Sequence, residues 1–183
     1  TNYPLTPFTD AGKTYCVLVE TTDADSNDVV DLGWGTFVFN PAPDAKPLSM
    51  DVPHPLNDTD TPEEGIAVFK GTNARTFLMA GAHREANHDD SPCDDDYHVA
   101  DAAHNADHPF HAAIEAMDAF DQARGQAFTS VQFHGMGTSS CPGVDVYITH
   151  GSKRPPLPNS LADQLKRNFG GAVPAAWDWT VTV

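Results

Sequence analysis

Basic residues are scarce in this sequence, and their scarcity excludes one broad class of partner. The 183 residues include 10 lysines and arginines against 26 aspartates and glutamates, which gives a formal net charge of −16 at pH 7. Such a surface repels a phosphate backbone, so we expect no nucleic-acid binding. The acidity suits a secreted protein kept soluble by hydrated carboxylates, or a protein from salty surroundings. A role in attracting cationic substrates is the less favoured explanation.

Long apolar runs are also missing. Hydrophobic residues make up 40% of the chain, enough for one core. No run approaches the roughly 18–20 apolar residues that a helix needs to cross a bilayer. The sequence therefore predicts a single domain over residues 1–183 without a membrane span. Because the chain begins Thr1-Asn2-Tyr3-Pro4 and not with Met, we expect a processed protein of secreted or periplasmic location.

Cysteine is rare, and none of the three cysteines forms a CxxC pair of the kind found in zinc ribbons. Cys93 and Cys141 both lie in loop-like sequence, so we expect a disulfide between them. Cys16 lies in an apolar run and is expected to be a buried free thiol. The alternative is that all three cysteines are free.

Hydrophobic periodicity predicts strands that alternate with helices. Apolar and β-branched runs indicate strands at residues 14–20, 34–40, 48–52, 74–80, 127–133, 144–149 and 177–183. Helical patterns indicate helices at residues 61–70, 108–120 and 160–169. This order predicts an α/β fold in three layers, with a mixed, mostly parallel sheet and helices on both faces. Residues 1–45 would form a β extension and residues 48–183 the core.

Histidine follows three of the expected strands. His54, His83 and His134 come directly after the strands at residues 48–52, 74–80 and 127–133. In α/β sheets ligands bind outside the carboxyl ends of the strands. A single histidine at such a place is more often structural, but three together favour a functional cluster.

Histidine nitrogens with one carboxylate are typical zinc ligands, and an open position is left for water in catalytic sites. His54 and His134 are the first two candidates, and Glu63 or Glu64 should supply the carboxylate. Glu64 has a competing role, since Thr61 and Glu64 match a helix capping box. Asp58 and Asp60 are the next candidates for the carboxylate ligand after Glu63 and Glu64.

Polar residues between the second and third of these histidines suggest catalytic and substrate-binding roles. Asp101 and His104 can form an acid/base or orienting pair, and Asn105 beside them is a candidate for substrate contact. Arg84 can bind a substrate carboxylate or stabilise an oxyanion. A structural salt bridge is the alternative for Arg84.

Two further patterns are weaker. His108 and His111 have the i,i+3 spacing of a two-histidine site, but solvated positions on a helix are favoured for both. Asp23-Ala24-Asp25-Ser26-Asn27 matches the first half of a calcium loop, although the later glycine and the closing glutamate are missing. A turn is favoured there, with Ca²⁺ as the alternative.

The order of motifs over residues 48–169 resembles the zinc-dependent amidohydrolase and carboxypeptidase-like group. This group includes N-acetylmuramoyl-L-alanine amidases, N-formylglutamate amidohydrolases and poly-γ-glutamate hydrolases. The matching segments are Asp51-Val52-Pro53-His54, Thr61-Pro62-Glu63-Glu64, His83-Arg84-Glu85-Ala86-Asn87 and Val131-Gln132-Phe133-His134-Gly135. The resemblance implies zinc on the two histidines and a glutamate, with Arg84 and Asn87 as substrate-binding residues.

One departure concerns the general base. The amidase branch of this group uses a late glutamate, whereas this chain has none after Glu115. Asp145, Asp163, His104 and Glu85 remain as candidates. We therefore expect a zinc-dependent hydrolase of an amide or peptide-like bond, on a small-molecule, cell-wall or polyglutamyl substrate. The alternatives are a phosphoester hydrolase that uses the same His/Arg cluster, and an extracellular binding domain without catalysis.

Overall fold

A computed structural model describes residues 3–27, 30–151, 154–172 and 180–182. The chain separates into two compact units, Thr1–Gly135 and Met136–Val183, which are described one at a time. Among the described residues, no helix combines the length and apolar character needed to cross a membrane. The single domain expected from the sequence stays a prediction.

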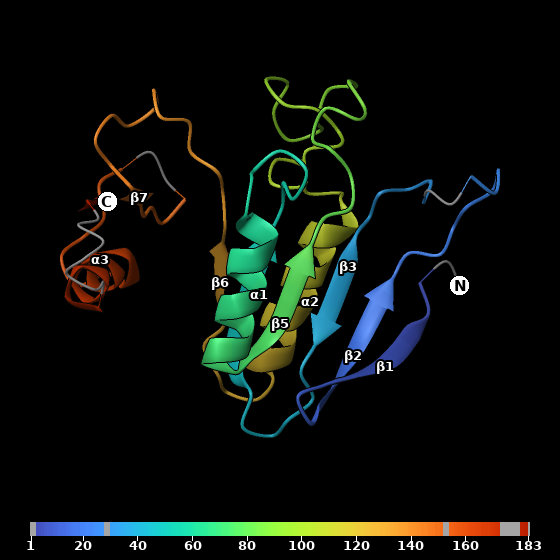
Figure 1. Ribbon diagram of the computed structural model, residues 1–183, viewed down its shortest axis with the longest axis horizontal. Coiled ribbons are helices and arrows are strands. Elements are labelled where there is room, and N and C mark those ends of the chain that lie inside the picture. Colours follow the sequence, from blue (N-terminus) through green and yellow to red (C-terminus); the bar gives the residue numbers. More distant parts are fainter. Residues whose placement is uncertain (1–2, 28–29, 152–153, 173–179, 183) are drawn as a thin grey trace. The chain divides into compact units, whose positions relative to one another are not determined.

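The first unit is built on a six-stranded sheet, which confirms the α/β class (Figure 1). The strands in sheet order are β1 (Leu5–Asp10), β2 (Lys13–Val19), β3 (Thr36–Phe39), β5 (Ala74–Met79), β4 (Lys46–Val52) and β6 (Thr129–Gln132). In the described part of this sheet, β5, β4 and β6 pair in parallel and the other three pairings are antiparallel. The sheet is mixed as expected, but the expectation that it is mostly parallel is wrong.

The parallel strands are joined by helices, as the alternating pattern predicted. Helix α1 (Thr61–Thr72) connects β4 to β5, and α2 (Pro109–Gln122) precedes β6. The structure adds β1, which the sequence reasoning missed. Because β4 lies between β5 and β6, the carboxyl ends of these three parallel strands meet at one edge of the sheet.

The second unit contains α3 (Leu161–Ala172) and a parallel pair of short strands, β7 (Val146–Tyr147) and β8 (Val181–Thr182). The helix expected at residues 160–169 is therefore present, and the strand expected at residues 144–149 is reduced to two residues. Most of the strand expected at residues 177–183 lies outside the described residues.

Two hydrophobic clusters form the core of the first unit. One contains buried Tyr15, Val52 and Phe77 from three strands, with Phe69 of α1. The other contains Leu78 of β5 and Phe110 of α2. Helix α1 approaches β4 closely because Gly65 carries no side chain. A Cβ at Gly65 would lie 2.7 Å from Val52 Cγ2.

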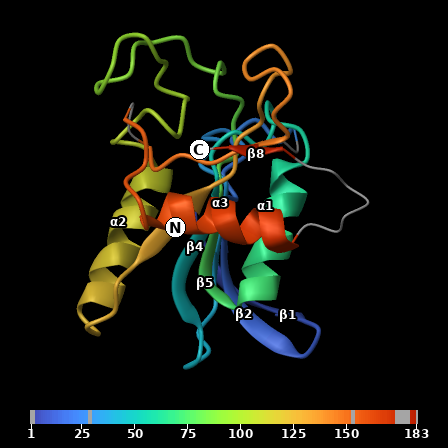
Figure 2. The same ribbon diagram turned by 90° about the vertical axis from the view of Figure 1, so that its left-hand side faces the viewer.

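The segment between β5 and α2, residues 80–108, is long and has little regular structure. It lies beyond the carboxyl end of β5 in both views (Figures 1 and 2). Within it, Cys93 is an exposed free thiol, and Cys16 and Cys141 are free as well. The expected Cys93–Cys141 disulfide is not formed, since all three cysteines are free thiols.

A carboxylate is buried inside the sheet close to this edge. Asp51 of β4 is fully buried, and its two oxygens accept hydrogen bonds from the hydroxyls of Ser49 and Ser130. Burial raises the pKa of Asp51 from 3.8 to about 6, and the two hydrogen bonds only partly oppose this rise.

Asp51 makes the free energy of unfolding depend on pH in a predictable direction. Because the folded-state pKa exceeds the unfolded value, the unfolded chain releases this proton first as the pH rises. The contribution of Asp51 to the free energy of unfolding therefore falls between about pH 4 and pH 6 and then levels off. Between pH 4 and pH 7 the wild type should lose about 3 kcal/mol more than Asp51→Asn, measured by urea denaturation. Equal losses in both proteins would contradict this, and Asp95→Asn, at an exposed aspartate, is the control.

Candidate metal centre

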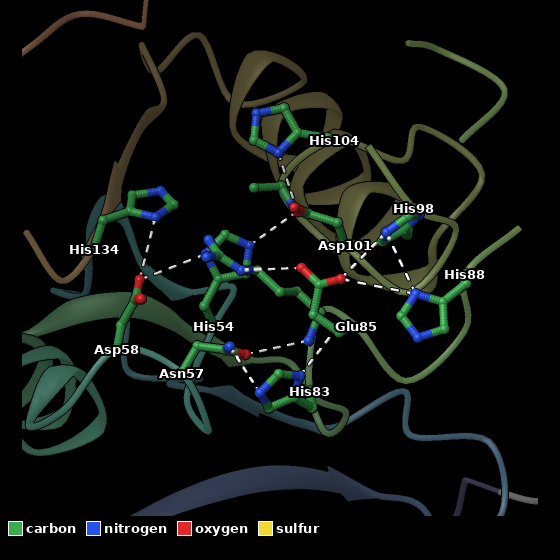
Figure 3. A network of polar contacts seen from close by, with 12 residues as sticks. His54, Asn57, Asp58, His83, Glu85, His88, His98, Asp101, His104 and His134 are labelled. Carbon is green, nitrogen blue, oxygen red and sulfur yellow. Dashed lines mark hydrogen bonds and ion pairs between the residues drawn. The ribbon is translucent and has the colours of Figure 1, made fainter. Parts of the chain in front are cut away.

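The edge where the parallel strands end brings two of the three strand-end histidines together (Figure 3). His54 follows β4 and His134 follows β6, and their ring centroids lie 5.1 Å apart. His83, after β5, is exposed, and its Nε2 lies 2.8 Å from Asn57 Nδ2. The cluster expected at the strand ends therefore forms from His54 and His134, with His83 on its outside.

The carboxylate of this group comes from Asp58, in the loop between β4 and α1. The backbone N–H groups of Asn57 and Asp58 both donate to the carbonyl of His54, at 3.1 and 2.9 Å, and turn the loop back toward the strand end. The Thr61 hydroxyl donates to the carbonyl of Asp58 at 2.8 Å. Asp58 Oδ2 then lies 3.5 Å from His54 Nδ1.

The same loop determines where the expected glutamate ligands, Glu63 and Glu64, lie, and their role as ligands stays a prediction. Helix α1 begins after Asp60, whose backbone is left-handed with φ 66°, and Asp60 makes no side-chain cap. Thr61 uses its hydroxyl on Asp58 instead of capping the helix. Glu63 and Glu64 are exposed on the first turn of α1, and neither belongs to a group of potential metal ligands among the described residues. Asp58, one of the two further carboxylate candidates, is the acid that lies beside both His54 and His134.

His54 is held in one orientation by a second carboxylate. Its Nε2 lies 2.9 Å from Asp101 Oδ1, and both side chains are almost completely buried. Because a carboxylate only accepts hydrogen bonds, the proton of neutral His54 is on Nε2 and the lone pair is on Nδ1. This Nδ1 is buried and has no hydrogen-bond partner among the described residues.

His134 repeats this arrangement at the exposed side of the group. Its Nε2 lies 3.2 Å from Gln132 Oε1, so Nε2–H donates to the amide oxygen and Nδ1 carries the lone pair. Nδ1 lies 3.6 Å from Asp58 Oδ2. Burial lowers the pKa of His134, and the negative charge of Asp58 opposes this effect. Two imidazole lone pairs thus face one carboxylate oxygen.

These three side chains fit a divalent transition metal. Zinc binds nitrogen and oxygen ligands at about 2.0–2.2 Å, so tetrahedral ligands lie about 3.3–3.6 Å from one another. Asp58 Oδ2 lies 3.5 Å from one Nδ1 and 3.6 Å from the other, and all three ligand atoms lie within 4.8 Å of one another. The set comprises His54, Asp58 and His134, and it leaves a fourth position for water or substrate.

Asp101 joins this group to His104. Its Oδ1 accepts from His54, from the backbone N–H of Ala103 at 3.0 Å and from His104 Nδ1 at 3.1 Å. Burial alone would raise the pKa of Asp101, but the hydrogen bonds from the two histidines outweigh it and lower the pKa. The His104 ring stacks on Tyr97, with centroids 3.5 Å apart. The expected Asp101–His104 pair is therefore in contact. The contact uses Nδ1 of His104 and does not involve its other ring nitrogen, Nε2.

The residues expected to bind substrate are placed less favourably. Arg84 is half-exposed with Nε 3.7 Å from Glu85 Oε1, which is the salt bridge considered as its alternative. Asn87 is exposed and accepts from the backbone of Asp89. Asn105 is buried, and its amide bonds to the backbone of Val99 and Asp107, so it stabilises the loop.

Two histidines of α2 differ from each other. His108 is buried at the start of α2, where its Nδ1 accepts from the backbone of Phe110, so a solvated position is wrong for it. Burial lowers the pKa of His108. His111 is partly exposed and pairs with Glu115 at 3.4 Å. Neither belongs to a group of potential metal ligands among the described residues.

The four candidates for the general base differ in the groups that they contact. Asp145 accepts from the backbone of Thr180, and Asp163 pairs with Arg167 at 2.7 Å, both within the second unit. Glu85 pairs with histidines of the 80–108 loop. His104 is the candidate that shares a hydrogen-bonded carboxylate with a ligand of the metal group.

Three further groups of side chains among the described residues could hold a metal ion. One of them, His54, Asp101 and His104, shares His54 with the group above. Asp23, Asp25 and Asp31 lie together in the loop before β3, where the calcium half-motif was noted. The Ca²⁺ alternative there stays a prediction. Glu85, His88 and His98 form the third group, which the sequence reasoning missed. The i,i+3 spacing of Glu85 and His88 was its available signal.

The comparisons with known proteins add no relative. No family model, no curated protein and no solved structure matches this chain.

Gly135 allows Asp58 to lie against the end of β6. A Cβ at Gly135 would lie 3.1 Å from both Cα and Cβ of Asp58, so Gly135→Ala would push the carboxylate away by a few tenths of an ångström. We expect Gly135→Ala to weaken zinc binding on the order of tenfold, because changes that displace a metal ligand without replacing it have effects of this size. Calorimetric titration of the metal-stripped protein measures this.

Gly137→Ala is the matched control, because a Cβ there meets only Ser140 Oγ at an ordinary 3.6 Å. Unchanged zinc affinity in Gly135→Ala would show that Asp58 does not bind the metal from this position.

Proposed function

We propose that this protein is a metal-dependent hydrolase of an amide or peptide-like bond, with a zinc-type ion on His54, Asp58 and His134. The observation that carries the proposal is the buried Nδ1 of His54, which has no hydrogen-bond partner in the described chain although its ring is fixed by Asp101. A buried polar atom without a partner destabilises a fold by about 1–3 kcal/mol. A metal ion that accepts the lone pair removes this penalty.

The hydrogen bonds that orient the two histidines favour a catalytic ion. Each histidine donates its outer N–H to an oxygen, one to Asp101 and one to Gln132, as metal-ligating histidines generally do. A bound zinc-type ion polarises a carbonyl oxygen and acidifies water. Three protein ligands, with His134 on the exposed side, leave room for a substrate.

His104 is the group that would move protons. Asp101 holds Nδ1–H of His104, and Tyr97 stacks on the ring, so the imidazole is fixed with Nε2 as the basic atom. The side chain is 38% exposed, which leaves Nε2 accessible to a substrate. Nε2 would take a proton from the attacking water and return it to the leaving amine. His104 would thus take the role that the late glutamate has in the amidases that this chain resembles.

The choice of an amide bond rests on the motif order that resembles zinc amidohydrolases, and with it we propose a secreted or periplasmic protein. Arg84 argues against the phosphoester alternative, since Glu85 already pairs with its guanidinium at 3.7 Å. A phosphate clamp requires a cation that is not neutralised by a neighbouring acid.

We also infer that the sheet has helices on both faces. Phe77 and Leu78 are consecutive in β5, so their side chains point to opposite faces. Phe77 packs with Phe69 of α1, and Leu78 packs with Phe110 of α2. This alternation supports three layers in the first unit.

The roles of ligand and proton carrier can be separated by mutation. His54→Ala and Asp58→Asn should lose both the bound metal and hydrolysis. His104→Gln should keep the metal and lose about 10²–10⁴-fold in kcat, because only the proton transfer is removed. His111→Gln, on α2 and outside the site, is the matched control. Metal content and hydrolysis of a cell-wall amide, poly-γ-glutamate and p-nitrophenyl phosphate are the measurements.

A protein that binds no zinc after reconstitution would overturn the proposal. Full activity in His104→Gln would remove that residue from the mechanism. Cleavage of the phosphoester alone would replace the amide by the phosphoester as substrate class.

A further inference from the structure

A second group of metal-ligating side chains lies in the 80–108 loop, apart from the ligands described above. His98 Nε2 lies 3.2 Å from Glu85 Oε2 and 3.5 Å from His88 Nδ1. His88 Nδ1 lies 3.9 Å from the same glutamate oxygen. The two rings are nearly perpendicular, with centroids 4.9 Å apart, so both nitrogens face Glu85 (Figure 3).

These distances are close to those between ligands of one ion, and the largest differs from the expected range by about 0.3 Å. Tetrahedral nitrogen and oxygen ligands of zinc lie about 3.3–3.6 Å apart, and the three atoms here lie 3.2, 3.5 and 3.9 Å apart. Arg84 contacts the other glutamate oxygen, Oε1, and leaves Oε2 to the histidines. Two imidazoles and one carboxylate favour zinc and related transition metals over magnesium or calcium.

The loop is held mainly by hydrogen bonds, several of them between backbone groups. An isolated bridge between Asp90 and His98 folds the chain back, and the backbone N–H of Val99 donates to Asp89. Most side chains of residues 83–97 are exposed, so burial contributes little there. Asp94, Asp95 and Asp96 add negative charge that attracts a cation.

We propose that Glu85, His88 and His98 bind a second zinc-type ion, which fixes the 80–108 loop. The ion joins Glu85 and His88, which are near in sequence, to His98 across the loop. The site is partly exposed and supplies three protein ligands, so water completes its coordination.

The fixed loop carries residues that support the first site. Ser91 donates through its hydroxyl to the carbonyl of His104, and Asn105 donates to the carbonyl of Val99. Both contacts connect the segment around His98 to the segment that contains Asp101. Loss of the second ion should therefore loosen Asp101 and His104 without removing a ligand of the first ion.

The test counts metal ions in the full chain. Metal-stripped protein is dialysed against zinc chloride, and the bound zinc is measured by plasma mass spectrometry. The wild type and the control His111→Ala should each hold two ions, and His88→Ala/His98→Ala should hold one. Glu85→Gln, a smaller change, should lower the affinity for the second zinc ion at least tenfold in a zinc titration. Hydrogen exchange of the backbone amides of residues 86–99 should slow severalfold when zinc is added to the wild type, and not in the double variant.

The outcomes separate the two sites. One ion in the wild type that disappears in His54→Ala and persists in His88→Ala/His98→Ala overturns the second site alone. One ion that shows the opposite pattern overturns the proposed function and keeps the second site. Two ions retained by the double variant, or amide exchange in residues 86–99 that zinc does not change, would also overturn the second site as described.

Discussion

The buried hydrogen bond between His54 Nε2 and Asp101 Oδ1, 2.9 Å long, is the contact on which the candidate site depends. It assigns the proton of His54 to Nε2 and leaves the Nδ1 lone pair facing Asp58. It also joins residues 47 positions apart, from the end of β4 and from the 80–108 loop. Since the same oxygen accepts from His104, one carboxylate orients both a ligand and the group proposed to move protons.

The sheet makes this contact possible. Strand β4 lies between β5 and β6, so the segments that follow these parallel strands meet at one edge. Gly65 lets α1 lie close to β4, and Gly135 lets Asp58 lie close to the end of β6. The site therefore draws on three chain segments, and each has local hydrogen bonds that shape it.

Local pattern predicted much of the fold. Apolar periodicity located α1, α2 and the parallel strands, and the strand-end rule identified His54 and His134. The position of Asp58 could not be predicted in this way, because the left-handed turn at Asp60 and the bonds to the His54 carbonyl bring it beside the histidines, and neither contact has a sequence pattern. Glu85, His88 and His98 were missed because a bridge across an irregular loop brings them together, and no periodicity reports such a contact. The antiparallel pairings of β1, β2 and β3 depend on register between strands, which single runs do not reveal.

The candidate site depends on neutral His54 presenting Nδ1 as a ligand nitrogen. Two-bond ¹H–¹⁵N correlation NMR on the metal-stripped, ¹⁵N-labelled protein at neutral pH measures this directly, with His54→Ala to assign the signals. We expect the Nε2–H form for His54, with an Nδ1 resonance of an unprotonated nitrogen that shifts when zinc is added. A proton on Nδ1, or an Nδ1 resonance that does not respond to zinc, would contradict it.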